Sequence, residues 1–528
     1  MENFNYNENK NYKNKLPDSS KLSISLRKKK LNQKLNEVHI LNETNITNKE
    51  EENENMTKLC TFSKSILEQK EIENFKNILD KIYFFIINIK IPLKPNFIKL
   101  SCIMPNLYQK LLLCEMEEIV LKKIFDVFEE IIKFLQPDDL DDCSNLFNEQ
   151  HFQLIYRLIE LYQNNQNMMN KIFYFLSNLI KLSNYIKEYL MMKPGCFFIQ
   201  SILSLDVIYP EQIIQLMFSF VNYENLNDKT MEDFEILFIQ ECDKLTNYFY
   251  KKSITDTKII MNNLKLLQNL YSCLSFISIS ENKEIKDIFF YDNKNDDINL
   301  YEKIILLEKY DREHLAVQIL RILNNFFCYP ELKYIQIIIE NKYFQYAIDR
   351  IFDQFNNENI IKESANALAN FVNTVEYRKI FIEKKYIIGI INITRKSNRY
   401  DITDSLLFLI SNIIYATKEI ELLSFIDTDI IPCCIELLLK IKEPTLLDIL
   451  LKIIQLLLIK GDPNTYIDCY CKKSEDKILN PFKYQFDTYG LYDILSNIQM
   501  NCKHENVIES IKNIFVHFYL IIFLKAIY

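Results

Sequence analysis

Glycine is almost absent from this chain, which has only Gly195, Gly389, Gly461 and Gly490 among its 528 residues. Phosphate loops and dinucleotide-binding turns need clustered glycines, because only glycine lets the backbone approach a phosphate closely. These four glycines stand alone, so neither motif is present. Proline is also scarce, at 12 residues. The abundance of Leu, Ile, Lys, Glu and Asn then predicts helices joined by short polar loops.

Recognisable catalytic groups are missing as well. None of the five histidines lies near an evident nucleophile or a pair of carboxylates in the sequence: His39, His151, His314, His504 and His517. Catalysis needs a base, a nucleophile and an orienting group within reach of one another. We therefore predict no catalytic residues and do not expect an enzyme.

The 13 cysteines are scattered, and several lie in apolar runs, such as Cys433 and Cys434. This pattern is typical of reduced, buried thiols in a protein of the cytoplasm or the nucleus. A Cys-x-Cys pair at Cys469 and a Cys-x-His pair at Cys502 have spacings that are unusual for structural zinc. We expect neither a metal nor another cofactor.

Membrane-targeting segments are not evident. The chain opens on a polar, Asn-rich stretch from Met1 to Asn14, which is unlike a signal peptide. The end, Ile514 to Tyr528, is apolar but contains His517 and Lys525 and is shorter than the roughly 20 residues that a membrane span needs. We expect a buried terminal helix there, with no membrane contact.

Positive charge is concentrated near the N-terminus. Residues 10–34 contain nine basic side chains and one acid, Asp18, for a net charge of +8. The whole chain has a net charge of −8, which leaves −16 for the rest. A basic arm on an acidic body predicts partners of opposite charge, or an arm that folds onto its own body, and disfavours nucleic acid as a ligand of the body.

Two regions follow from composition. Residues 1–60 are rich in Asn, Lys and Glu and predict a mostly disordered basic arm followed by an acidic linker, with one possible helix from Ser25 to Leu41. Residues 61–528 have apolar residues at helical spacing, in segments of 10 to 18 residues separated by polar clusters. The segment Thr445 to Lys460 is apolar on nearly every side, as expected of an inner helix.

An asparagine recurs at a nearly constant interval at the end of these apolar segments. The steps are 44 between Asn178 and Asn222, 45 between Asn325 and Asn370, and 42 from Asn370 to Asn412. This is the length of an armadillo or HEAT repeat, and it predicts an all-α, right-handed superhelical solenoid of nine or ten repeats. Because each side-chain amide has both donors and an acceptor, such a row could hold the backbone of an extended peptide.

The wider frame of these repeats resembles the importin-α family. The segments Gln318 to Asn325, Lys362 to Asn370 and Asp404 to Asn412 each place a wall residue four positions before the asparagine, in the family's order. Gly461-Asp462 and residues 480–528 resemble the family's last inner helix and capping repeat. The resemblance implies an armadillo groove formed by Tyr174, Asn178, Phe218, Asn222, Arg321, Asn325, Glu363, Asn370, Phe408 and Asn412.

The arm resembles an importin-β-binding segment in two pieces, Tyr12 to Lys15 and Leu26 to Lys30. The resemblance implies importin-β contacts at Lys13, Lys15, Arg27, Lys28 and Lys30. It implies a nuclear import adaptor that shuttles between cytoplasm and nucleus. Its partners would be importin-β, cargo proteins with basic localisation signals, and an export receptor for recycling.

The chain departs from that family at the groove itself. It has no tryptophan, and the wall positions Ser272 and Asn366 cannot stack on a ligand side chain. Lys181-Leu182 stands where the family has Gly-Asp, and the arm lacks the family's central arginine run. Two alternatives therefore stay open. The asparagines and aromatic residues could reflect an Asn-rich composition and core packing, and the protein could be a non-transport scaffold or assembly chaperone for one partner.

Overall fold

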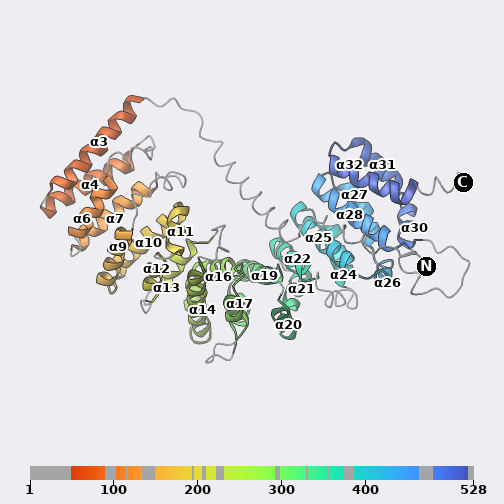
Figure 1. Cartoon of the computed structure of the whole chain (residues 1–528). Coiled ribbons are helices and arrows are strands. Elements are labelled where there is room, and N and C mark those ends of the chain that lie inside the picture. The colour runs from red at the N-terminus through yellow and green to blue at the C-terminus, as the bar shows by residue number, and fades with distance from the viewer. Residues whose placement is uncertain are drawn as a thin grey trace, which may run out of the picture. The chain divides into compact units, whose positions relative to one another are not determined.

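The computed structural model describes residues 49–69, 71–89, 103–113, 117–133, 149–192, 195–204, 210–221, 231–291, 298–328, 331–353, 357–372, 386–462 and 480–520. Within these ranges every regular element is a helix (Figure 1). The chain forms two compact units, residues 1–207 and 208–528. The predicted all-α armadillo-type repeat fold is confirmed, whereas the sequence predicted one continuous solenoid and gave no sign of the division at residue 207.

The first unit contains eight described helices. They are α3 (Lys49–Glu68), α4 (Ile72–Asn88), α6 (Ile103–Leu113), α7 (Glu118–Ile132), α9 (Glu149–Tyr162), α10 (Gln166–Leu182), α11 (Asn184–Met191) and α12 (Gly195–Ser204). Helices α4, α7 and α10 pack in sequence, as do α3 and α6, so that equivalent helices of successive repeats lie beside each other. This stacking is what gives a repeat protein its continuous core.

The second unit begins with α13 (Pro210–Phe218), α14 (Glu232–Thr255), α15 (Thr257–Asn262), α16 (Leu264–Ile277), α17 (Lys283–Phe290), α18 (Leu300–Leu307), η3 (Glu308–Tyr310) and α19 (Arg312–Cys328). It continues with α20 (Leu332–Glu340), α21 (Tyr343–Phe352), α22 (Glu358–Phe371), α24 (Tyr386–Lys396), α25 (Tyr400–Ala416), α26 (Glu419–Leu422), η4 (Leu423–Phe425), α27 (Ile430–Lys440) and α28 (Pro444–Lys460). It ends with α30 (Pro481–Thr488), α31 (Leu491–Asn501), α32 (Glu505–Phe515) and a π-helical turn (Val516–Leu520).

One helix of each repeat in this unit packs on its equivalent in the next repeat, in the order α13, α16, α19, α22, α25, α28 and α32. We call these helices the third-helix row, because α19 and α22 are each the third helix of a repeat. Figure 1 shows α16, α19 and α22 in this order. The row positions the candidate site.

Helix α28 of the row is buried along most of its length, which explains its apolar sequence, whereas the last helix, α32, buries one stripe. In α28 the buried residues include Leu446, Leu450 and Ile454. The helix starts with proline at its first position, where no backbone N–H is needed. The Glu443 side chain accepts a hydrogen bond from the Leu446 N–H at 2.8 Å. The predicted inner helix from Thr445 to Lys460 is thus confirmed.

Asparagine begins many of these helices. At five helix starts an Asn side chain accepts a hydrogen bond from a backbone N–H of the first turn: Asn165, Asn282, Asn299, Asn357 and Asn480. The first N–H groups of a helix lack intrahelical partners, and asparagine is among the best residues at satisfying them. Part of the chain's high Asn content therefore serves local structure.

Polar links between repeats follow the predicted period. Lys171 pairs with Asp126 in the first unit, and in the second Lys333 pairs with Asp287 at 2.9 Å. The sequence separations are 45 and 46 residues. Because each link joins equivalent positions of adjacent repeats, the spacing seen for asparagine is the repeat length of the fold.

The N-terminal boundary differs from the prediction. Helix α3 starts at Lys49, so the acidic run Glu50 to Glu54 belongs to a helix of the first repeat and not to a disordered linker. The sequence prediction extends the arm and its acidic linker to residue 60, because a charged, amphipathic first helix has the composition of a linker. No helix in the described part of the chain is long and apolar enough to cross a membrane.

Candidate functional site

The structure places most of the predicted groove residues on the expected helices. Asn325, Asn370 and Asn412 lie near the C-terminal ends of α19, α22 and α25, which are neighbours in the third-helix row. Tyr174 and Asn178 lie one turn apart on α10 of the first unit. Six predicted residues fall outside the described part of the chain: Asn222 of the groove, and Lys13, Lys15, Arg27, Lys28 and Lys30 of the arm.

Tyr174 is available to a ligand, since 47% of its surface is exposed. Asn178 is half-buried. One turn before Tyr174, Lys171 pairs with Asp126 of α7 and lies 3.7 Å from Glu129. The two acids that α7 presents to α10 thus already share a lysine of this chain, while the Tyr174 ring remains exposed.

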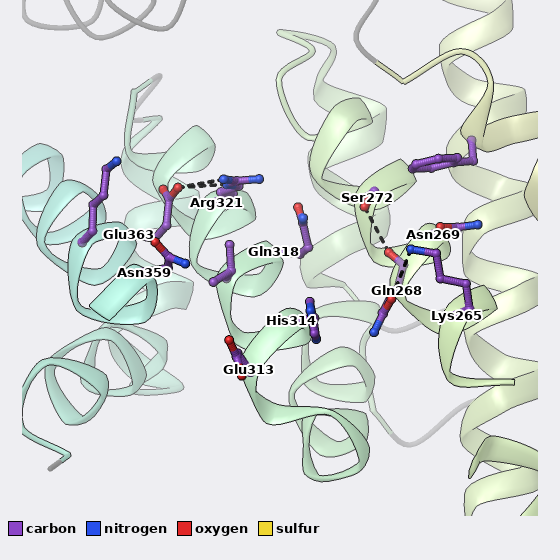
Figure 2. A pocket seen from close by; sticks show the side chains of 13 residues that line it. Lys265, Gln268, Asn269, Ser272, Glu313, His314, Gln318, Arg321, Asn359 and Glu363 are labelled. Atoms are coloured by element: carbon purple, nitrogen blue, oxygen red, sulfur yellow. Dashed lines mark hydrogen bonds and ion pairs between the residues drawn. The ribbon is translucent and has the colours of Figure 1, made fainter. Parts of the chain in front are cut away.

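In the second unit, four helices of the third-helix row surround a concave pocket of about 400 Å³, shown in Figure 2. We call it the central hollow. Its lining residues are Phe218, Lys265, Gln268, Asn269, Ser272, Glu313, His314, Val317, Gln318, Arg321, Asn359, Lys362 and Glu363. Four positions of the predicted frame meet here: Phe218, Ser272, Arg321 and Glu363. The hollow brings together residues that are up to 145 positions apart, as far as Phe218 is from Glu363.

An ion pair crosses the hollow from α19 to α22. The Nε and Nη2 atoms of Arg321 both lie 3.0 Å from Oε1 of Glu363 (Figure 2). The Arg321 side chain is 40% exposed and that of Glu363 is 9% exposed. Two donors on one acceptor fix the guanidinium, so Arg321 presents its remaining N–H groups toward the hollow from a defined position.

A second set of charges is linked to the hollow through Lys362, one of its lining residues. Lys362 binds Asp401 of α25 at 3.0 Å, and Arg399 binds the same carboxylate at 2.9 Å. Burial works to raise the pKa of Asp401, but hydrogen bonds from Arg399 and Lys362 outweigh it and hold that pKa well below its usual range. Asp401 is therefore ionised at every physiological pH and already has its counter-charges.

The hollow is not acidic. Its lining includes three basic side chains (Lys265, Arg321 and Lys362) against two acids (Glu313 and Glu363). Both His314 and Gln268 are held by Asp311, at 3.0 and 2.5 Å. The carboxylates of this region already have partners within the chain: Arg321 pairs with Glu363, Lys362 and Arg399 pair with Asp401, and Asn357 donates to Glu313.

The predicted asparagines of the second unit point toward the preceding helix of the row. Nδ2 of Asn325 donates to the Ser275 carbonyl at 3.1 Å and to Ser278 Oγ at 2.8 Å. Nδ2 of Asn370 donates to Asn324 Oδ1 at 2.6 Å and to Cys328 Sγ at 3.3 Å. In this structure their donors link repeats, and their role in ligand binding stays a prediction.

Asn412 follows the same pattern. Its Nδ2 donates to the Ala369 carbonyl at 2.8 Å. Phe408, the wall residue one turn earlier on α25, is half-buried, as is Asn366 on α22. Phe408 thus retains a partly exposed ring beside Asn412, while Asn366 has no ring to offer.

The sequence prediction missed the N-terminal half of the hollow. Gln318 and His314 precede Arg321 by three and seven positions, and Gln268 and Lys265 precede Ser272 by four and seven. Those spacings place each pair on the same helix face as the wall residue. Figure 2 shows His314 and Gln318 of α19 between the side chains of α16 and those of α22. Extending the frame by two helical turns would have found them.

The cysteines near the C-terminus form no metal site in the part of the chain that the structure describes. Cys469 and Cys471 lie outside the described residues, and Cys502 is half-buried. Within the part of the chain that the structure describes, no group of three or more His, Cys, Asp or Glu side chains is arranged to hold a metal ion.

Comparison with known proteins finds likeness in structure alone. No protein-family model matches the sequence. No curated protein matches it either. The crystal structure of an engineered protein is similar with a TM-score of 0.60 and 13% identity, over 87% of this chain and 97% of that one. This likeness shows the fold.

Two further solved structures have lower scores. One is a designed armadillo repeat protein in complex with the peptide (KR)4, with a TM-score of 0.36 and 16% identity over 47% of this chain and 92% of that one. The other comes from a study of a phosphorylation switch between cadherin and beta-catenin, with a TM-score of 0.38 and 10% identity over 88% and 96%. The stacking of its own helices makes this chain an all-α, armadillo-type repeat protein.

Proposed function

We propose that this protein is a nuclear import adaptor that binds an extended, basic segment of its cargo and recruits importin-β through its basic arm. The observation that carries the proposal is the central hollow, because wall residues from three successive repeats of the frame line it together with Glu363. Convergence of these positions on one concave face favours a common ligand over independent packing roles. The exposed ring of Tyr174 adds a stacking surface in the first unit.

A second candidate is a non-transport scaffold for one protein partner, and specific observations favour it. The acids Glu363 and Asp401 are paired internally, and both amide hydrogens of Asn325 and Asn370 are engaged. A ligand recognised through those groups would have to displace bonds of the protein itself. A dedicated partner of mixed charge, which also forms hydrogen bonds with Gln268 and Gln318, would fit such a surface.

The ring of Tyr174 provides a test of basic-ligand binding with little structural risk. We expect Tyr174→Ala to weaken binding of a fluorescent lysine-rich peptide to the full chain by roughly threefold to tenfold. The reason is that the substitution removes the attraction between a lysine ammonium group of the peptide and the aromatic ring. Fluorescence anisotropy measures the dissociation constant. Tyr185→Ala is the matched control, since Tyr185 on α11 is 39% exposed but lies outside the row α4, α7 and α10. Equal effects of both substitutions would refute the assignment of Tyr174.

Recruitment of importin-β separates the two candidate functions. Under the import proposal, the full chain captures importin-β in a pull-down. The double substitution Arg27→Ala/Lys28→Ala should lower capture at least tenfold, because it removes two positive charges that would pair with carboxylates of importin-β. The same double variant should bind the lysine-rich peptide no more weakly than the wild-type chain. Absence of capture by the wild-type protein would leave the scaffold function as the better account.

A further inference from the structure

The ends of the third helices are joined by side-chain donors from the next repeat. Asn325 reaches Ser275 and Ser278 at the end of α16, and Asn412 reaches the Ala369 carbonyl in the last turn of α22. At the following joint a lysine does the same, because Lys460 Nζ donates to the Tyr415 carbonyl at 2.7 Å. The last carbonyls of a helix have no intrahelical partner, and the Ala369 and Tyr415 carbonyls receive one from the next repeat. The Ser275 carbonyl already accepts a hydrogen bond from Ser278 Oγ, so there Asn325 adds a link between repeats.

Burial makes the bonds of Asn325 and Asn370 part of the joint and not of the ligand surface, whereas Asn412 is half-buried. Asn325 is 8% exposed and Asn370 is 9% exposed. The Asn370 amide lies between α19 and α22, bonded to Asn324, which is 2% exposed. A buried amide that loses its partner has no water to replace it, so each bond favours the closed joint by more than an exposed bond would.

We propose that Asn325, Asn370 and Asn412 are joint clips, which hold each third helix against the preceding one and set how readily the repeats separate. A ligand whose carbonyls take these amide hydrogens opens the joint that it occupies. The clip itself does not rest on the proposed function, because it is a property of the protein without any ligand. Only the competition with a ligand depends on it.

Local opening of the joints tests the clips. Asn370→Asp keeps the shape of the side chain but replaces the donor group with an oxygen that faces Asn324 Oδ1. We expect hydrogen–deuterium exchange in the last turn of α19 to accelerate by roughly tenfold or more, with α28 unchanged, since one joint opens while the others stay closed. Mass spectrometry of peptic fragments resolves the affected helix.

The matched control is Asn366→Asp, one turn earlier on the same helix. Asn366 makes no side-chain hydrogen bond within the described residues and is half-buried. We expect exchange in α19 to stay within twofold of wild type for this variant. Acceleration by Asn366→Asp to the same extent as by Asn370→Asp would show a general effect of charge and would overturn the proposal.

A variant at a second joint provides an independent test in case Asn370→Asp does not fold. Asn412→Ala removes one bond to the Ala369 carbonyl and should accelerate exchange in the last turn of α22, not in α19. Unchanged exchange in α22 would contradict the clip at this joint. Adding the lysine-rich peptide to the wild-type chain tests whether a ligand competes with the clips. If the peptide binds by anisotropy yet leaves exchange at the joints unaltered, the competition is wrong while the proposed function stands.

Discussion

Replacing Arg350 with alanine should destabilise the second unit by about 3–5 kcal/mol, because it leaves a carboxylate buried without its counter-charge. Arg350 Nη2 lies 2.6 Å from Oε2 of Glu308, and the two side chains are only 18% and 5% exposed. The pair joins α21 to η3, and the guanidinium also lies 4.7 Å from the centre of the Tyr346 ring. Urea unfolding followed by circular dichroism measures the loss.

A double substitution distinguishes the ion pair from simple loss of packing. Arg350→Met/Glu308→Leu removes both charges and keeps much of the volume, so it should be far less destabilised than Arg350→Ala. If the double variant is as unstable as the single one, side-chain volume and not the uncompensated Glu308 charge explains the effect. A cost below about 1 kcal/mol for Arg350→Ala would instead place the pair among weak surface pairs.

The second large effect concerns Glu235 and depends on pH. Burial raises the pKa of this carboxyl from 4.5 to about 7, the hydrogen bond from Ser280 opposes the rise, and Glu232 adds to it. Glu235 is 4% exposed, and Ser280 Oγ lies 2.6 Å from its Oε2. The folded state therefore binds a proton that the unfolded state releases, so stability falls as the pH rises from about 4.5 to above 7.

Glu235→Gln should remove this dependence. The glutamine carbonyl can still accept the Ser280 hydrogen bond, and the side chain carries no charge. Relative to wild type, we expect the variant to gain about 2.5 kcal/mol between pH 5 and pH 8, because most of the free energy of a pKa difference of roughly 2.5 develops within this range. Urea midpoints of both proteins at the two pH values measure the difference. A constant difference across this range would show that Glu235 has an ordinary pKa.

The sequence predicted the helices of the second unit well because their burial is visible in composition. Helix α28 begins at Pro444 and ends at Lys460, as its continuous apolar stretch indicates. The start of α3 at Lys49 could not be found in this way, since a charged first helix exposes most of one face to water. The division at residue 207 has no marker either, because residues 205–209 are as apolar as the helices around them.

For the candidate site, periodicity identified a helix face but not the direction of each side chain. Asn370 lies on the predicted face, yet its amide turns to Asn324 of the preceding repeat, a choice that depends on packing between helices. Arg321 and Glu363 both line the central hollow, but their mutual pairing depends on the separation of α19 and α22. Spacing within one helix contains no information on that separation.

The nearly constant separation of the links between repeats also bears on synthesis. Lys171 bonds Asp126, 45 residues earlier, and Asn412 bonds Ala369, 43 residues earlier. Contacts so close in sequence form without the entropy cost of closing long loops. Each repeat can therefore complete its packing once the next one has left the ribosome, and the growing chain exposes only its most recent apolar helices to aggregation.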